Sequence, residues 1–245
     1  MTSGIGRQFI KGTYYRYLER SDQDKGVPQP PLQLDYPATQ APIALPTPHE
    51  VTGNPLDIRE AIEKRRSVRQ YSSQPLSLAE LSFLLWCTQG VKQVIGRPVT
   101  LRTVPSAGAR HAFETYLLIN RVDGLAPGLY RFLALEHKLL EIDLSADVAA
   151  RMVEACWRQQ FVRTSAATFI WTAVAYRMTW RYGERGYRYL FLDAGHVCQN
   201  LYLAAQAVGC GVCAIAAFDD EAVNRLLGLD GEEQFAIYLA SVGKL

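Results

Sequence analysis

The chain has 245 residues, and its 26 lysines and arginines against 24 aspartates and glutamates leave a formal net charge of +2. A chain of this length forms one large domain or two small ones and buries a sizeable core, which excludes a disulfide-stapled mini-protein. The small net charge argues against nucleic acid or an anionic membrane as the main partner. A small molecule is therefore the expected ligand.

Cellular location is the next property that the sequence constrains. The longest strongly apolar stretch, residues 166–176, is shorter than the roughly 20 residues that cross a bilayer, so no membrane span is expected. The N-terminus shows no apolar run followed by a small-residue cleavage site, and we expect a cytoplasmic protein. The five cysteines are an odd number in apolar surroundings, which predicts buried free thiols.

Residues 1–53 are predicted to form an extended N-terminal arm, and residues 54–245 the main domain. Seven of the twelve prolines fall between Pro28 and Pro48, a density that disfavours both a helix and a central strand. The arm also carries large apolar side chains such as Tyr14 and Leu34. We therefore expect it to lie along the main domain or along a partner subunit.

Two helices are expected at the start of the main domain. Asn54 as N-cap and Pro55 at the first helical position predict a helix through Arg66. A capping box at residues 77–80 predicts a second helix, with Gly90 as its left-handed stop.

The remaining elements mix strands and helices. We expect strands at 113–122, 129–135, 138–144, 167–178, 212–218 and 235–242, and helices from Ser145 to about Gln159, from 187 to 208 with Gly209 as its end, and from a cap at Asp219 or Asp220 to Leu227. Because regular βαβ alternation is absent, the class is α+β or a mixed-sheet αβα layer structure.

A cluster of cations at residues 65–69 has the chemistry of a phosphate clamp. It places Arg65, Arg66, Ser67 and Arg69 within five residues, and each guanidinium can bind two oxygens in a fork. The alternative is a solvated helix end whose cations complement the macrodipole, and composition alone favours that alternative. The small residues Pro105–Ala109 let a flat ring approach the backbone, although an ordinary turn has the same composition.

Two metal- or nucleotide-like patterns are less convincing. Residues 209–214 match the letters of the dinucleotide fingerprint, but a helix precedes them and a strand follows, which is the reverse of the required order. Four residues could be drawn as zinc ligands, but their apolar neighbours favour packed thiols: His196, Cys198, Cys210 and Cys213. We expect no metal.

Two further patterns suggest other chemistry. Ser106, Asp193 and His196 could form a hydrolase triad, but the serine lacks the Gly-x-Ser-x-Gly elbow. The segment 177–189 interleaves cations with aromatic residues. This pattern could indicate stacking on RNA, but the low net charge makes a site for a planar or anionic small molecule more plausible. Packed arginine–aromatic contacts are the alternative.

Six segments together resemble one known family. They are RRSVRQY at 65–71, ELSFLLWCTQGV at 80–91, RTVPSAGARHAFETYL at 102–117, GLYRF at 128–132, RYGERGYRYLFLDAGHVCQNLYLAA at 181–205 and AIAAFDD at 214–220. In this order they resemble the nitroreductase superfamily, and more narrowly its SagB-type dehydrogenase branch. The resemblance implies an FMN-dependent oxidoreductase with a mixed β-sheet flanked by helices, in an interlocked homodimer with one flavin at each of two subunit interfaces.

The resemblance also implies three groups of FMN contacts. One holds the phosphate and ribityl chain (Arg65, Arg66, Ser67, Arg69 and Lys244), one comes from the other subunit and covers the ring (Pro105, Ser106, Ala107 and Ala109), and one presents backbone N–H groups to flavin N5 (Ala216 and Ala217). Arg69 could also reach the pyrimidine edge. Many relatives have Glu-Gly where this chain has two alanines.

The implied chemistry is ping-pong hydride transfer, with NADH or NADPH as the candidate donor and a small molecule as the other substrate. SagB-type azoline dehydrogenases use a Lys-Tyr pair where this chain has Arg181-Tyr182, and an arginine is a poor general base. We expect Tyr182 to be a proton donor and Arg181 an anion or substrate anchor. A leader-peptide recognition domain before residue 1 and a longer tail after Leu245 are not expected. A peptide azoline dehydrogenase and a non-catalytic flavin-binding protein are the alternatives.

Overall fold

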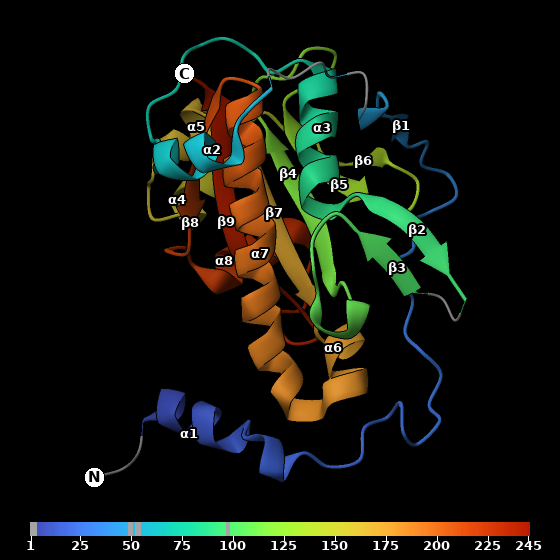
Figure 1. Ribbon diagram of the computed structural model, residues 1–245. Coiled ribbons are helices and arrows are strands. Elements are labelled where there is room, and N and C mark those ends of the chain that lie inside the picture. Colours follow the sequence, from blue (N-terminus) through green and yellow to red (C-terminus); the bar gives the residue numbers. More distant parts are fainter. Residues whose placement is uncertain (1–3, 49–50, 52–54, 97–98) are drawn as a thin grey trace.

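The computed structural model describes residues 4–48, 51, 55–96 and 99–245. Within them, seven strands form one sheet in the order β1-β6-β5-β4-β7-β9-β8, and each neighbouring pair is antiparallel (Figure 1). The parallel contacts of the described chain are two single bridges, Ser67–Val212 and Leu76–Val122. The sheet is therefore antiparallel along its strands and mixed only through these bridges.

The strands of the sheet are β1 (Ile43–Ala44), β4 (Phe113–Ile119), β5 (Gly128–Leu133), β6 (Lys138–Asp143), β7 (Ala167–Val174), β8 (Cys210–Ile215) and β9 (Gln234–Lys244). A separate hairpin pairs β2 (Val91–Ile95) with β3 (Val99–Arg102). The five predicted strands that correspond to β4, β5, β6, β8 and β9 are confirmed, with shifted ends. The hairpin and β1 were not predicted.

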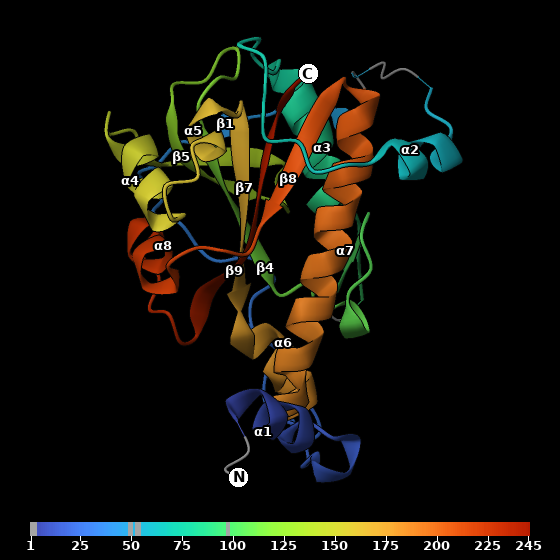
Figure 2. The ribbon, with the colours of Figure 1, turned by 90° about the vertical axis from the view of Figure 1, so that its left-hand side faces the viewer.

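The helices are α1 (Ile5–Gly12), α2 (Ile58–Lys64), α3 (Leu78–Gln89), α4 (Val148–Ala155), α5 (Phe161–Thr164), α6 (Ala175–Tyr182), α7 (Gly186–Ala207) and α8 (Asp220–Leu227). Figures 1 and 2 show α3 and α7 on one face of the sheet and α4, α5 and α8 on the other. Among the described residues, no helix combines the length and apolar character needed to cross a bilayer.

Alternating side chains of the central strands connect these layers. In β7, Phe169 and Trp171 belong to the core beneath α3 and α7, whereas Ile170 belongs to the core beneath α4 and α8. This alternation follows from the two-residue period of a strand. The αβα arrangement expected from the sequence is thereby confirmed.

The first helix of the main domain differs from the prediction at both ends. Asn54 lies outside the described residues, and Asp57 caps α2 by accepting the backbone N–H groups of Arg59 and Glu60. The helix ends at Lys64 instead of Arg66. It stops there because the following chain runs beside β8, where Val68 donates its N–H to the Val212 carbonyl at 2.8 Å.

The second helix confirms its predicted start but not the predicted role of its end. Ser77 and Glu80 form the capping box of α3. Gly90, however, has a φ of −58°, which is not left-handed. A glycine is required at position 90 because any larger residue would clash: a Cβ there would lie 2.4 Å from the Trp86 ring.

The strand predicted at 167–178 is too long at its C-terminal end. β7 ends at Val174, opposite Gln234, where its partner β9 begins. Without a partner strand beyond that point, the chain turns into α6. The strand period alone could not locate this boundary, because the limit is set by the partner.

The helix predicted at residues 145–159 is also shorter than expected. Asp147 takes the N-cap position of α4, without a side-chain cap, and the helix ends at Ala155. Trp157 and Arg158 then adopt left-handed φ values of 52° and 59°, which separate α4 from α5. In contrast, α7 with the left-handed Gly209 after it and α8 with its Asp219 cap are confirmed.

The N-terminal residues follow the surface of the main domain (Figure 1). Trp180 donates its indole N–H to the Val27 carbonyl at 2.9 Å, and Arg177 donates to the Pro31 carbonyl at 2.7 Å. Further along, β1 pairs with β6. The segment also contains α1, an unpredicted helix whose Phe9 packs edge-on against Phe191 of α7.

Candidate functional site

Arg65 and Arg66 line a pocket of about 250 Å³ beside the edge strand β8. Gly209–Val212 and Tyr202 of α7 also line it. The Arg65 guanidinium sits 5.2 Å from the Tyr202 ring centroid, and the hydroxyls of Ser67 and Tyr202 are hydrogen-bonded at 3.1 Å. The extended run after α2 therefore places the predicted phosphate ligands along β8.

These arginines differ from their neighbours in their charge partners. Within the described chain, Arg65, Arg66 and Arg69 form no ion pair, whereas Arg59 and Lys64 of α2 each pair with a glutamate one turn away. The three guanidiniums also follow the helix instead of forming its last turn. Both facts argue against the solvated helix end and leave their donors available for an anion.

Further along β8, Arg69 and Ala216–Ala217 continue the same line of residues. Arg69 lies close enough to oppose the rise in the pKa of Cys213 that burial causes. Ala216 lies four positions after Val212, which is about 13 Å of extended chain. Both alanines are exposed, and the Ala217 carbonyl accepts a hydrogen bond from Gln159 at 2.7 Å.

Lys244 lies on β9 opposite Cys210 of β8, but it does not line the pocket of Arg65 and Arg66. Its ammonium group donates to the Glu80 carboxylate and to the Val208 carbonyl, the latter at 2.8 Å. Its charge is therefore already compensated by the start of α3.

The loop at residues 105–109 is anchored by a carboxylate from α7. Ser106 donates its hydroxyl to Asp193 at 2.6 Å, and the Ala107 N–H donates to the same carboxylate at 3.2 Å. The Ser106 oxygen in turn accepts the His111 N–H at 2.9 Å. Burial raises the pKa of Asp193, and the hydrogen bonds that it accepts from Ser106 and Ala107 oppose the rise. Ser106 thus directs its proton to a carboxylate, and exposed His196 shares no bond with it within the described chain.

The same loop holds an unusual backbone conformation. Gly108, Ala109 and His111 have φ values of 55°, 53° and 43°. For residues other than glycine, a left-handed conformation costs roughly 1 kcal/mol. A Cβ on Gly108 would lie 2.4 Å from the Tyr182 hydroxyl, so this glycine allows close contact with the end of α6.

Within one chain, the predicted site residues lie in two separate groups. The loop at 105–109 meets Arg181 and Tyr182, because Gly108 packs against both side chains. The Arg65 group instead contacts α7 at Tyr202, nine residues beyond Asp193, which is about 13 Å along the helix. The two groups therefore contact different parts of α7.

Asp193 was missed as an anchoring residue, and its replacement tests that role. Asp193→Asn keeps one acceptor but turns an amide N–H group toward the donors of the loop. We expect hydrogen exchange at residues 105–111 to quicken by about tenfold or more, the worth of one hydrogen bond to a charged group. Exchange measured by mass spectrometry, with Glu221→Gln on α8 as control, checks this. Unchanged exchange would show that the carboxylate does not hold the loop.

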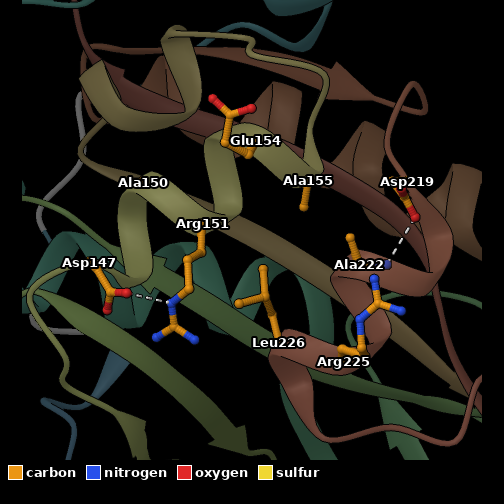
Figure 3. Close-up of a pocket in the computed structure, with 9 residues that line it drawn as sticks. All are labelled: Asp147, Ala150, Arg151, Glu154, Ala155, Asp219, Ala222, Arg225 and Leu226. Carbon is orange, nitrogen blue, oxygen red and sulfur yellow. Dashed lines mark hydrogen bonds and ion pairs between the residues drawn. The ribbon is translucent and has the colours of Figure 1, made fainter.

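A second hollow, of about 640 Å³, lies between α4 and α8 on the opposite side of the sheet (Figure 3). It contains none of the predicted site residues. Arg151 on its wall already pairs with Asp143 and Asp147, at 2.6 and 3.2 Å, and Arg225 lies 3.6 Å from Glu221. Its charges are compensated, so it lacks the free donors found beside β8.

The cysteine and metal chemistry considered from the sequence finds no geometric support. In the described part of the chain, no group of histidine, cysteine and acidic residues is placed to hold a metal. Cys198 is buried, and burial raises its pKa to about 12. Such a thiol stays protonated and behaves as a packing residue.

The nitroreductase family model matches residues 62–244, and the chain therefore belongs to the nitroreductase family. A protein of Methanocaldococcus jannaschii described as a nitroreductase is 34% identical over 189 residues, which cover 77% of this chain and 91% of that protein. The trifolitoxin-processing protein TfxB of Rhizobium leguminosarum bv. trifolii is 30% identical over 133 residues, which cover 53% of this chain but only 36% of TfxB.

Two solved structures show the same fold. A nitroreductase structure from Anabaena variabilis has a TM-score of 0.68 at 27% identity and covers 86% of this chain, which spans 45% of that one. The E. coli microcin synthetase complex McbBCD, with truncated pro-MccB17 bound, has a TM-score of 0.58 at 16% identity and covers 97% of this chain and 92% of that one. The similarity to TfxB agrees with the resemblance to the SagB-type branch.

Proposed function

We propose that this member of the nitroreductase family is an FMN-dependent oxidoreductase that moves hydride from NADH or NADPH to a small molecule in a ping-pong sequence. Bound FMN supplies the two-electron chemistry at its N5 atom. The observation that carries the proposal is the set of three guanidiniums without ion-pair partners beside β8. Such donors match the charge and fork geometry of a phosphate group.

The residues along β8 fit the length of FMN as well as its charge. Arg65 and Arg66 would hold the phosphate, and Ser67 and Arg69 would follow the ribityl chain toward the pyrimidine edge. The exposed residues Ala216 and Ala217 lie about 13 Å beyond Val212, where a ring would follow the chain. Lys244 joins this set only by exchanging Glu80 for the phosphate.

A homodimer would complete the site. As the family resemblance implies, we propose that Pro105, Ser106, Ala107 and Ala109 come from a partner subunit and cover the ring. The exposed side of α7 offers an apolar contact surface in Phe191 and Leu192, which are 59% and 55% exposed. A partner subunit at this position would cover these two side chains.

Two side chains at the loop have proposed roles toward the substrate. Tyr182, whose hydroxyl lies at Gly108, would donate a proton to the reduced acceptor. Arg181 is exposed beside it and would anchor an anionic group. The loop itself, fixed by Asp193, would exclude water from the reacting face.

A peptide azoline dehydrogenase is the second candidate. The similarity to a trifolitoxin-processing protein and the shared fold of the microcin synthetase complex favour it. Arg181 occupies the place of the proton-handling lysine, and an arginine is a poor general base, which argues against this candidate. A non-catalytic flavin-binding protein remains the third possibility.

The visible spectrum of the native protein tests these proposals. We expect a yellow protein that loses its colour when NADH or NADPH is added without oxygen. Lasting colour with both donors contradicts the reductase and favours the dehydrogenase or the non-catalytic protein, which an azoline-containing peptide as donor then separates. A colourless protein that takes up no FMN contradicts all flavin proposals.

A further inference from the structure

Arg110, the residue directly after the loop at 105–109, is buried without a carboxylate partner. Its side chain is only 5% exposed, and its guanidinium carbon lies 5.1 Å from the Trp180 ring centroid. In the described chain it forms no ion pair, and its one hydrogen bond is a long contact of 3.4 Å to the Gly108 carbonyl. A buried cation is costly unless an anion or several good acceptors compensate it.

Arg181 also lies beside Gly108. Its Nε atom is 3.0 Å from the position of a Cβ on Gly108, and its guanidinium carbon lies 5.5 Å from the Tyr182 ring centroid. Burial lowers the pKa of Arg110, and the charge of Arg181 lowers it further. Two like charges are thus held beside one turn of backbone.

The carboxylates near this pair are engaged elsewhere. Asp193 accepts Ser106 and Ala107 on the inner side of the loop. Asp24, which also feels the charge of Arg181, is bonded chiefly by Ser21. In the part of the chain that the structure describes, the two guanidiniums have an excess of donors and positive charge and no ion-pair partner.

We propose that Arg110 and Arg181 form an anion subsite that binds a carboxylate or phosphate group of a substrate. The aromatic faces of Trp180 and Tyr182 support the two guanidiniums, and a guanidinium offers a two-pronged donor to such a group. That the bound molecule reacts at this subsite rests on the proposed function. The subsite restricts the substrate class to small anionic molecules or to a phosphate-bearing hydride donor.

Matched substrate pairs test the subsite and separate the two sources of the anion. The carboxylate arm compares 4-nitrobenzoate with neutral 4-nitrobenzyl alcohol as acceptors, and the phosphate arm compares NADPH with NADH. In one arm we expect a preference for the member with the additional anionic group, which is 4-nitrobenzoate or NADPH with its 2′-phosphate. Arg181→Gln should reduce that preference about tenfold through KM. Arg110→Gln should act in the same direction, whereas Arg110→Lys should keep part of the preference.

A binding measurement keeps the subsite testable if the protein has no reductase activity. We expect benzoate or inorganic phosphate to raise the melting temperature of the native protein, since a ligand stabilises the state that binds it. Arg181→Gln should remove this rise, and the exposed α8 control Arg225→Gln should retain it. The subsite is contradicted if neither anion stabilises the native protein and neither arm shows a preference. It is also contradicted if Arg181→Gln lowers activity equally for both members of the preferred pair.

Discussion

Replacing Arg65 and Arg66 together by glutamine is expected to weaken FMN binding by about 100-fold or more. Each arginine can contribute a charge-assisted hydrogen bond worth about 1.5–3 kcal/mol, which is roughly tenfold or more in affinity. The pair follows the C-terminal end of α2, where the helix dipole repels an anion. The side chains must therefore supply the whole attraction for the phosphate.

Titration of the FMN-free protein by flavin fluorescence measures this loss. Arg59→Gln is the matched control, because Arg59 lies on the same helix but is already paired with Glu63 at 2.9 Å. Raising the salt concentration should weaken binding to the native protein more than to the double variant. Equal affinity of the double variant and the native protein would remove the phosphate clamp from the proposal.

Glu114→Gln is expected to lower the free energy of unfolding by about 3–5 kcal/mol, because it leaves a buried cation unpaired. Glu114 accepts Arg177 at 2.7 Å and the backbone N–H of Leu34 at 2.9 Å, and both charged side chains are 3% exposed. The carboxylate also supports a second buried cation, since its charge raises the pKa of Arg102, which burial lowers to about 10.

Urea denaturation with an unchanged m-value measures the cost. The control is Glu63→Gln, whose exposed pair with Arg59 is worth only about 0.2–1 kcal/mol. Because Glu114 also binds Leu34, faster hydrogen exchange at residues 27–36 should accompany the loss. A cost near that of the control would mean that the buried pair adds no net stability.

The elements that were predicted correctly are those whose sequence pattern lies within a few neighbouring residues. The capping box of α3, the apolar spacing of α7 and the Asp219 cap of α8 are all local patterns, and each is present. The errors lie where distant residues decide. β7 ends at Val174 because β9 begins opposite it, and Gly90 is fixed by the Trp86 ring.

The same distinction holds for the candidate site. The arginine cluster at 65–69 was visible as a local motif, but its lack of ion-pair partners depends on the surrounding fold. Asp193 anchors Ser106 from 87 residues away, and Arg110 depends on Trp180. One signal was available for Asp193: it lies between Leu190 and Ala194 on the buried face of α7, where a carboxylate requires a partner.

The attachment of the N-terminal residues has a consequence for the order of folding. Val27 is bonded to Trp180 across 153 positions, and the Ile10 carbonyl to Arg188 across 178. At a synthesis rate of about 5–20 residues per second, roughly 10–35 s pass between the synthesis of α1 and that of Arg188, which donates to it. Contacts so distant in sequence form late. Phe9 therefore lacks its packing partner Phe191 until α7 has been made.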